Sequence, residues 1–219
     1  MFVTEKILVR KLGKAEYQPT VEAMREFTAA RNADTADELW LLEHPPVYTL
    51  GLAADAAHGP PPGCGIPVVQ VERGGEITYH GPGQVVLYTL VDLARRGIKV
   101  KQFVAMLEQS VIDLLGGSAG RGVERAQRII ERAQRVAGAP GVYVGGAKVA
   151  ALGIRVSRGR AFHGLSLNVD MDLAPYSAIN PCGHPGMKVT QTRDLGTAED
   201  KEALGNRLAE ILAAKLEHA

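Results

Sequence analysis

The sequence has 219 residues, of which 25 are basic and 24 are acidic, so its formal net charge is +1. Such a small excess charge does not indicate nucleic acid as the main partner. The two cysteines, Cys64 and Cys182, are too few for a disulfide framework or a four-cysteine zinc site.

No apolar run in the sequence approaches the roughly 20 residues that are needed to cross a bilayer. The first ten residues also lack the apolar core of a secretory signal peptide. At this length the chain suits one domain that buries roughly 70% of its unfolded surface. We therefore expect a single domain over residues 1–219, located in the cytoplasm, with neither a nucleic-acid nor a membrane partner.

Strand-like and helix-like patterns alternate along the first half of the chain. His44-Pro45-Pro46 forces a bend between two short strands, because proline restricts the residue before it. The predicted elements are a strand over 6–12, a helix over 19–31, short strands over 38–43 and 47–50, buried strands over 66–71 and 84–90, and a helix around 103–115.

A glycine-rich segment, 73–84, lies between the last two of these strands and reads RGGEITYHGPGQ. Its glycines allow a backbone to approach a ligand closely, and Arg73, Thr78, Tyr79 and His80 add polar groups within a short span. It lacks the closing Gly-Lys-Ser/Thr of a P-loop and the spacing of a dinucleotide fingerprint. We interpret it as the lining of a pocket, although a plain connecting turn would have a similar composition.

The segment that follows the second helix contains a repeat, because Glu-Arg-Ala-Gln-Arg occurs at residue 124 and again at residue 131. Apolar residues three and four apart, with Glu–Arg pairs at i,i+4, predict an amphipathic helix over 123–137.

The pattern turns to strands after residue 141. Runs over 148–156 and 160–169 are joined by Ser157-Arg158-Gly159, which predicts a hairpin. Lys148 has the same parity as the apolar residues of its strand, so it should point into the interior or a cleft unless a bulge at Gly145-Gly146 resets the register. The alternative is a lysine at the strand end whose stem packs on the protein while its ammonium reaches water. Burial disfavours the charged form of a lysine. A capping-box pattern that begins at Thr197 then precedes a C-terminal amphipathic helix.

Cys182 lies in the segment Ile-Asn-Pro-Cys-Gly-His-Pro-Gly-Met, residues 179–187. Prolines and glycines on both sides exclude regular structure and present the thiol on a constrained turn. Such a cysteine is a candidate nucleophile, and an unreactive surface thiol is the alternative. Cys64 has no acid or base near it in the sequence, and we interpret it as incidental.

Five motifs together resemble one known family, the octanoyltransferases of lipoate biosynthesis. They lie between residues 38 and 196 and are WLLEHPPV from residue 40, the segment 73–84, residues 145–157, HGLSLNV from residue 163, and residues 179–196. The resemblance implies a mixed α+β domain with the biotin/lipoate protein ligase-like fold. The duplicated Glu-Arg-Ala-Gln-Arg segment departs from the family, where we expect a shorter link.

The resemblance also implies roles for particular residues. Cys182 would be the acyl-thioester nucleophile, and Lys148 would be its partner, either as a base and acid or as a charge beside the thiolate. The implied substrate-binding residues are Arg73, Gly74, Gly75, Glu76, Ile77, Thr78, Tyr79 and His80, then Ala151, Leu152 and Gly153, and finally Gly164, Leu165 and Ser166.

The family moves an octanoyl group from octanoyl-acyl carrier protein to a lysine of lipoyl domains. Its acceptors are the lipoyl domains of 2-oxoacid dehydrogenases and the glycine cleavage H protein. No cofactor is expected, neither ATP nor a metal, because the donor thioester already activates the acyl group. We further expect backbone N–H groups near Cys182 and Lys148 to stabilise the oxyanion.

Three other functions remain open from the sequence. An ATP-dependent lipoate or biotin ligase of the same fold would need an adenylate site and no cysteine nucleophile. A cysteine hydrolase would pair Cys182 with His80, His163 or His184, while His44, His58 and His218 look like ordinary surface or loop histidines. A non-enzymatic acyl-binding protein would need neither the thiol nor the lysine.

Overall fold

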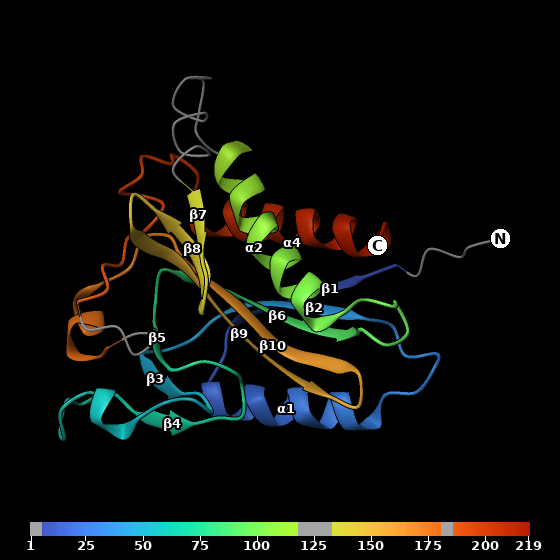
Figure 1. The fold of residues 1–219 in the computed structure, drawn as a ribbon, viewed down its shortest axis with the longest axis horizontal. Coiled ribbons are helices and arrows are strands. Elements are labelled where there is room, and N and C mark those ends of the chain that lie inside the picture. Colours follow the sequence, from blue (N-terminus) through green and yellow to red (C-terminus); the bar gives the residue numbers. More distant parts are fainter. Residues whose placement is uncertain (1–5, 118–132, 181–185) are drawn as a thin grey trace.

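The computed structural model describes residues 6–117, 133–180 and 186–219. A seven-stranded mixed sheet with the order β1-β2-β6-β10-β9-β8-β7 forms the centre of the molecule (Figure 1). Only the β1–β2 pair is parallel among these neighbours. The strands are Leu8–Lys14 (β1), Glu38–Glu43 (β2), Gln84–Asp92 (β6), Ala133–Val136 (β7), Ala139–Val144 (β8), Ala147–Ser157 (β9) and Arg160–Asn168 (β10).

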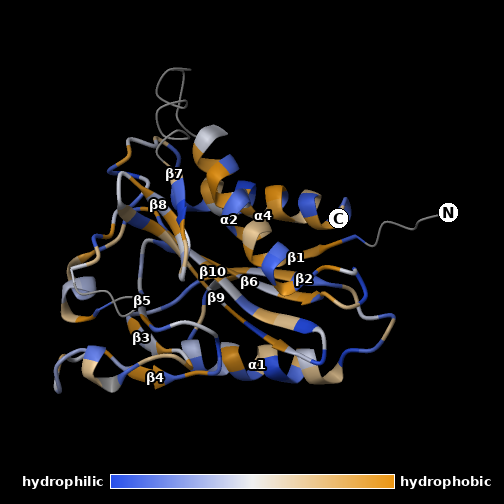
Figure 2. Cartoon of the chain, in the orientation of Figure 1, coloured by the Kyte–Doolittle hydropathy of each residue, from blue (hydrophilic) through white to orange (hydrophobic). Residues whose placement is uncertain are grey.

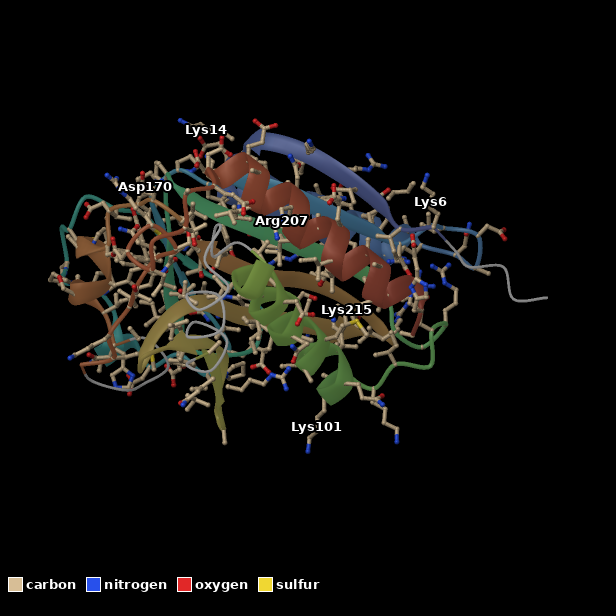
Figure 3. The ribbon with its side chains drawn as sticks, turned by 90° about the horizontal axis from the view of Figure 1, so that it is seen from above. Lys6, Lys14, Lys101, Asp170, Arg207 and Lys215 are labelled. Atoms are coloured by element: carbon tan, nitrogen blue, oxygen red, sulfur yellow. The ribbon has the colours of Figure 1, made fainter. Side chains whose placement is uncertain are left out.

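Two helices, α2 (Val100–Gly117) and α4 (Lys201–Glu217), cover one face of this sheet (Figure 1). Hydrophobic and hydrophilic residues alternate along both helices, as an amphipathic helix on a sheet requires (Figure 2). Phe103 and Leu107 of α2 and Leu208 of α4 are fully buried in the largest core cluster. An ion pair of 2.7 Å between Lys215 and Asp113 also joins the two helices, and Figure 3 labels Lys215 on α4.

The opposite face is covered by α1 (Tyr17–Ala30) and by a second, smaller sheet (Figure 1). This sheet has the order β4-β3-β5, built from Val68–Gln70 (β4), Val47–Leu50 (β3) and Ile77–His80 (β5). Two short 3₁₀ helices, η1 (Ala56–His58) and η2 (Ala174–Ala178), lie in the connections. Because layers cover both faces of the main sheet, all nine residues of the central strand β6 are buried.

The predicted α+β fold class is confirmed, and several elements lie where the sequence placed them. The short strands β2 and β3 have the predicted bounds. The hairpin between β9 and β10 turns at Arg158 and Gly159, which have φ angles of 51° and 80°. No helix among the described residues is long and apolar enough to cross a membrane.

The predicted helix over 123–137 is wrong where the structure describes it. Residues Ala133–Val136 form strand β7, which pairs antiparallel with β8, and residues 118–132 lie outside the described residues. Gly138, with a φ angle of 79°, closes the turn between the two strands. A free edge on β8 offered this segment backbone hydrogen bonds, and a helical repeat pattern contains no information about such an edge.

Two smaller predictions are corrected as well. The strand predicted over 66–71 is shorter and is not buried, because β4 is an edge strand of the small sheet. The C-terminal helix is capped by Asp200 and not by Thr197, since the Asp200 side chain accepts a hydrogen bond from the Ala203 amide at 2.8 Å.

Candidate active site

A pocket of about 210 Å³ lies between the main sheet and the small sheet. A volume of roughly 10–15 Å³ on this measure holds one water molecule, so the pocket has room for a larger ligand. The three segments predicted to bind substrate meet in it. The lining from these segments comprises Arg73, Gly75, Glu76, Ile77, Thr78 and His80, then Ala151, Leu152 and Gly153, and finally Gly164, Leu165 and Ser166.

Strand pairing explains why the second and third segments meet. In the antiparallel pair of β9 and β10, Leu152 lies opposite Leu165 and Gly153 lies opposite Gly164. Gly153 also admits the first segment, because a Cβ on it would lie 2.9 Å from the Gly74 carbonyl oxygen. The glycines at this contact therefore allow two segments of the protein's own backbone to lie close together.

Gly74 and Tyr79 do not line the pocket. The Gly74 amide donates to the carbonyl oxygen of Ile154 at 2.9 Å, which ties the glycine-rich segment to β9. The Tyr79 ring is buried and packs between Tyr48 and Tyr176, with ring centres 5.4 and 5.6 Å away. Both residues shape the pocket wall from behind.

The Arg73 side chain is buried and held by protein atoms. Its guanidinium donates to both the carbonyl and the hydroxyl oxygen of Thr49 at 2.8 Å, and to the Gly74 carbonyl at 3.0 Å. Buried guanidinium groups need several acceptors to offset the loss of water. Arg73 therefore joins the small sheet to the glycine-rich segment and places a positive charge in the pocket wall.

Lys148 lies in the pocket wall and is only 4% exposed. Its ammonium lies 3.5 Å from the Pro140 carbonyl oxygen and 5.1 Å from the centre of the Tyr143 ring. An ammonium above an aromatic ring is stabilised by the ring's quadrupole. The position is therefore both enclosed and able to hold a cation.

A bulge on β9 turns Lys148 toward the pocket, which differs from the predicted parity. Val142 pairs with Ala150 while the next residue, Tyr143, pairs with Lys148, so Val149 is an extra residue on β9. Ile154 and Val156 pack on the core beneath α2 and α4. The sequence placed Lys148 on the same face as these residues, and the bulge moves it to the other face.

Cys182 and His184 lie outside the described residues, but the chain on both sides of the segment 181–185 is held near the pocket. On one side, the Asn180 amide donates to the His58 carbonyl oxygen at 3.1 Å. On the other side, the Lys148 amide donates to the Lys188 carbonyl at 2.8 Å, and the Thr190 amide donates to the Lys148 carbonyl at 2.9 Å. The Lys148 amide is thereby engaged, so it does not serve as one of the oxyanion donors expected near this residue.

The sequence did not identify the aromatic side chains at this pocket. Tyr17 from the start of α1 and Tyr88 from β6 line it together with His163 of β10. Burial raises the pKa of Tyr17 to about 12 and raises the pKa of Tyr88. These residues are far apart along the chain, and no local pattern in the sequence connects them.

Three histidines near the pocket are buried and neutral. Burial lowers the pKa of His44 and of His163 to about 4, and burial together with His44 lowers the pKa of His80 to about 3. His44 lies in the loop between β2 and β3 but not at the surface, since it is fully buried and its Nε2 lies 2.7 Å from the Tyr88 hydroxyl. A general base works best with a pKa near the working pH, so His80 and His163 suit the hydrolase alternative poorly.

A comparison with protein families identifies the chain. Residues 16–212 match the lipoyl protein ligase A/B catalytic domain. The chain belongs to this family. Among the curated members of the family are two proteins named octanoyltransferase, from Aromatoleum aromaticum and Thiobacillus denitrificans. They are 55% and 57% identical to this chain over 95% and 94% of its length, and the matches cover 85% and 89% of their own lengths.

Solved structures show the same fold at much lower identity. A bi-partite lipoate protein ligase from Thermoplasma acidophilum, described with its E2 lipoyl domain, matches with a TM-score of 0.70. The match covers 96% of this chain and 84% of that protein, at 15% identity. At this identity the likeness shows only the lipoate protein ligase-like fold, so the reaction must be inferred from the site and from the relatives that are more similar.

Proposed function

We propose that this protein is an octanoyltransferase of lipoate biosynthesis that acts through an octanoyl thioester on Cys182. The observation that carries the assignment is the 55–57% identity to octanoyltransferases over almost the whole chain. The pocket between the two sheets, with Lys148 in its wall, supports the mechanism. The proposed donor is octanoyl-acyl carrier protein, and the proposed location is the cytoplasm, where thiols stay reduced.

In the first step the Cys182 sulfur attacks the donor thioester. A free thiol has a pKa near 8.5 and is only a few per cent thiolate at neutral pH, so it needs activation. The enclosed amine of Lys148 supplies it, either by accepting the thiol proton or by pairing with the thiolate. The carrier's thiol leaves with a proton, and one thioester replaces another at little cost in free energy.

The acyl chain then occupies the pocket, where apolar side chains provide its walls. Ile77, Val86, Leu152 and Leu165 line the pocket from β5, β6, β9 and β10. Transfer of the roughly seven aliphatic carbons of an octanoyl group from water to such walls stabilises the acyl-enzyme by roughly 0.8 kcal/mol for each group that is fully buried.

In the second step a lysine amine of a lipoyl domain attacks the thioester and forms an amide. An amide is more stable than a thioester, so this step runs downhill, and we propose that neither ATP nor a metal takes part. The proposed acceptors are the lipoyl domains of 2-oxoacid dehydrogenases and the glycine cleavage H protein.

A transfer assay without ATP tests this function. The protein is incubated with octanoyl-acyl carrier protein and an unmodified lipoyl domain, and the lipoyl domain is weighed by mass spectrometry. We expect one octanoyl group to be added by the wild type and by Cys64→Ser, whereas Cys182→Ser should lose the activity by about 10⁴-fold or more, because covalent catalysis is removed.

The alternatives give different results in the same assay. A strict need for ATP would indicate a ligase. Release of free octanoate with no modified lipoyl domain would indicate a hydrolase. Either result would overturn the proposed function.

A further inference from the structure

An acidic and an imidazole side chain face each other at the pocket. His58 Nδ1 of η1 lies 3.8 Å from Oε2 of Glu76, and these side chains are 29% and 22% exposed. Glu76 also lines the pocket. The pair is therefore in contact both with the pocket and with solvent.

The backbone around this pair is held on three sides. The Gly51 amide donates to the Glu76 carbonyl at 3.2 Å, and the His58 amide donates to the Asp55 carbonyl at 2.9 Å. The His58 carbonyl in turn accepts the Asn180 amide at 3.1 Å. Asn180 is two residues before Cys182 in the sequence, so His58 is connected directly to the chain that leads to the nucleophile.

The charges in the pocket wall make Glu76 the group that can attract a cationic substrate. Among the described residues that line the pocket, Glu76 is the only carboxylate, while Arg73 and Lys148 are cationic side chains. The acceptor lysine arrives as an ammonium, since its ordinary pKa is about 10.4. Two cations in the wall oppose its approach, and the Glu76 carboxylate is the group that attracts it.

Proton balance creates a second requirement. When a lysine ammonium becomes an amide nitrogen, it loses two protons. One proton returns to the Cys182 sulfur as the carbon–sulfur bond breaks, and the other must reach solvent. A half-exposed imidazole beside a carboxylate can accept that proton and release it to water.

We propose that Glu76 and His58 form the receiving site for the acceptor lysine, a role that rests on the proposed octanoyl transfer. Glu76 binds the lysine ammonium, and His58 accepts one proton from it, with the resulting imidazolium stabilised by Glu76. The neutral amine then attacks the thioester carbon, the amide bond forms, and the sulfur leaves and takes up the second proton. The site acts in the second half-reaction, when the acceptor lysine arrives at the loaded enzyme.

The test separates the two half-reactions with Glu76→Gln and His58→Gln. Octanoyl-enzyme is first formed from the donor and followed by intact mass, and the lipoyl domain is then added. We expect His58→Gln to load within about twofold of the wild-type rate, while transfer to the lipoyl domain slows by about 10²-fold in both variants, the usual contribution of a general base. Glu76→Gln should mainly raise the KM for the lipoyl domain, and His58→Gln should mainly lower kcat.

Hydroxylamine serves as a second acceptor, because it is largely uncharged at neutral pH and needs neither ammonium binding nor deprotonation. His58→Gln should release octanoyl hydroxamate at the wild-type rate. Glu72→Gln is the matched control, since Glu72 lies four residues earlier and pairs at 2.5 Å with Arg25, away from the pocket lining. This control should behave as the wild type with both acceptors.

Two results would overturn the proposal. One is unchanged transfer to the lipoyl domain in both variants. The other is an equal loss in loading, in transfer and in the hydroxylamine reaction, which would indicate general damage to the pocket. If the wild type forms no octanoyl-enzyme at all, the proposed function fails first, and the receiving site fails with it.

Discussion

Lys148→Met is expected to lower the rate of octanoyl transfer by about 10³-fold, within the range for loss of a general acid–base group. Methionine has a similar length and an apolar side chain, so it fills much of the same space, but it lacks the ammonium that lies beside Tyr143 and Pro140. It removes only the amine that would activate the Cys182 thiol. The rate of octanoyl-enzyme formation, followed by intact mass under single-turnover conditions, measures this loss directly.

Lys188→Met is the matched control for this experiment. Lys188 is exposed, and its backbone carbonyl accepts the Lys148 amide, so the two lysines occupy adjoining segments. The control variant should load at the wild-type rate. An equal loss in both variants, or normal loading by Lys148→Met, would contradict the role of Lys148.

Asp37→Ala is expected to have the largest effect on stability, with a loss of about 3–5 kcal/mol in the free energy of unfolding. Asp37 is fully buried and forms ion pairs with Arg31, Arg95 and Arg96. It also accepts the Asp92 amide at 2.8 Å. Its removal would leave the guanidinium of Arg31, whose side chain is fully buried, without a counter-charge.

Urea unfolding of Asp37→Ala and of Asp170→Ala measures this difference. Asp170 pairs with Arg193 at 2.7 Å, but both side chains are more than half exposed, and such pairs contribute little to stability because solvent screens them. We expect a large decrease in the urea midpoint for the first variant and almost none for the second. Similar midpoints for the two variants would show that the buried cluster around Asp37 contributes no more than a surface ion pair.

Several basic side chains near this cluster are engaged with carboxylates of the protein itself. Arg95 and Arg96 are engaged with Asp37, and Arg160 lies 3.5 Å from a carboxylate oxygen of Asp92. These three basic side chains are therefore partly committed to interactions within the fold. The sequence shows where basic residues cluster, but it does not show which carboxylates lie beside them in the folded protein.

The sequence predicted those features that depend on local chemistry. The two prolines after His44 placed the boundary between β2 and β3, and Arg158-Gly159 placed the hairpin turn. The segments predicted to bind substrate line one pocket, and the pairing of β9 with β10 brings two of them together. Such features can be predicted because they depend on residues that are neighbours in the sequence or lie on adjacent strands.

Features that depend on distant partners were not predictable. Residues Ala133–Val136 have a helical repeat pattern but pair with the edge of β8. Lys148 reaches the pocket through a bulge at Val149 that the alternation of side chains does not reveal. Tyr17 and Tyr88 meet in the pocket only because α1 packs beneath the main sheet. In each case tertiary packing overrides a local preference.

The most direct test of the account is the mass of the protein after exposure to octanoyl-acyl carrier protein alone, with neither ATP nor acceptor present. We expect the mass of the wild type to increase by one octanoyl group, which is located on the Cys182 peptide and is removed by hydroxylamine. An unmodified wild type, or an adduct that persists in Cys182→Ser, would contradict it.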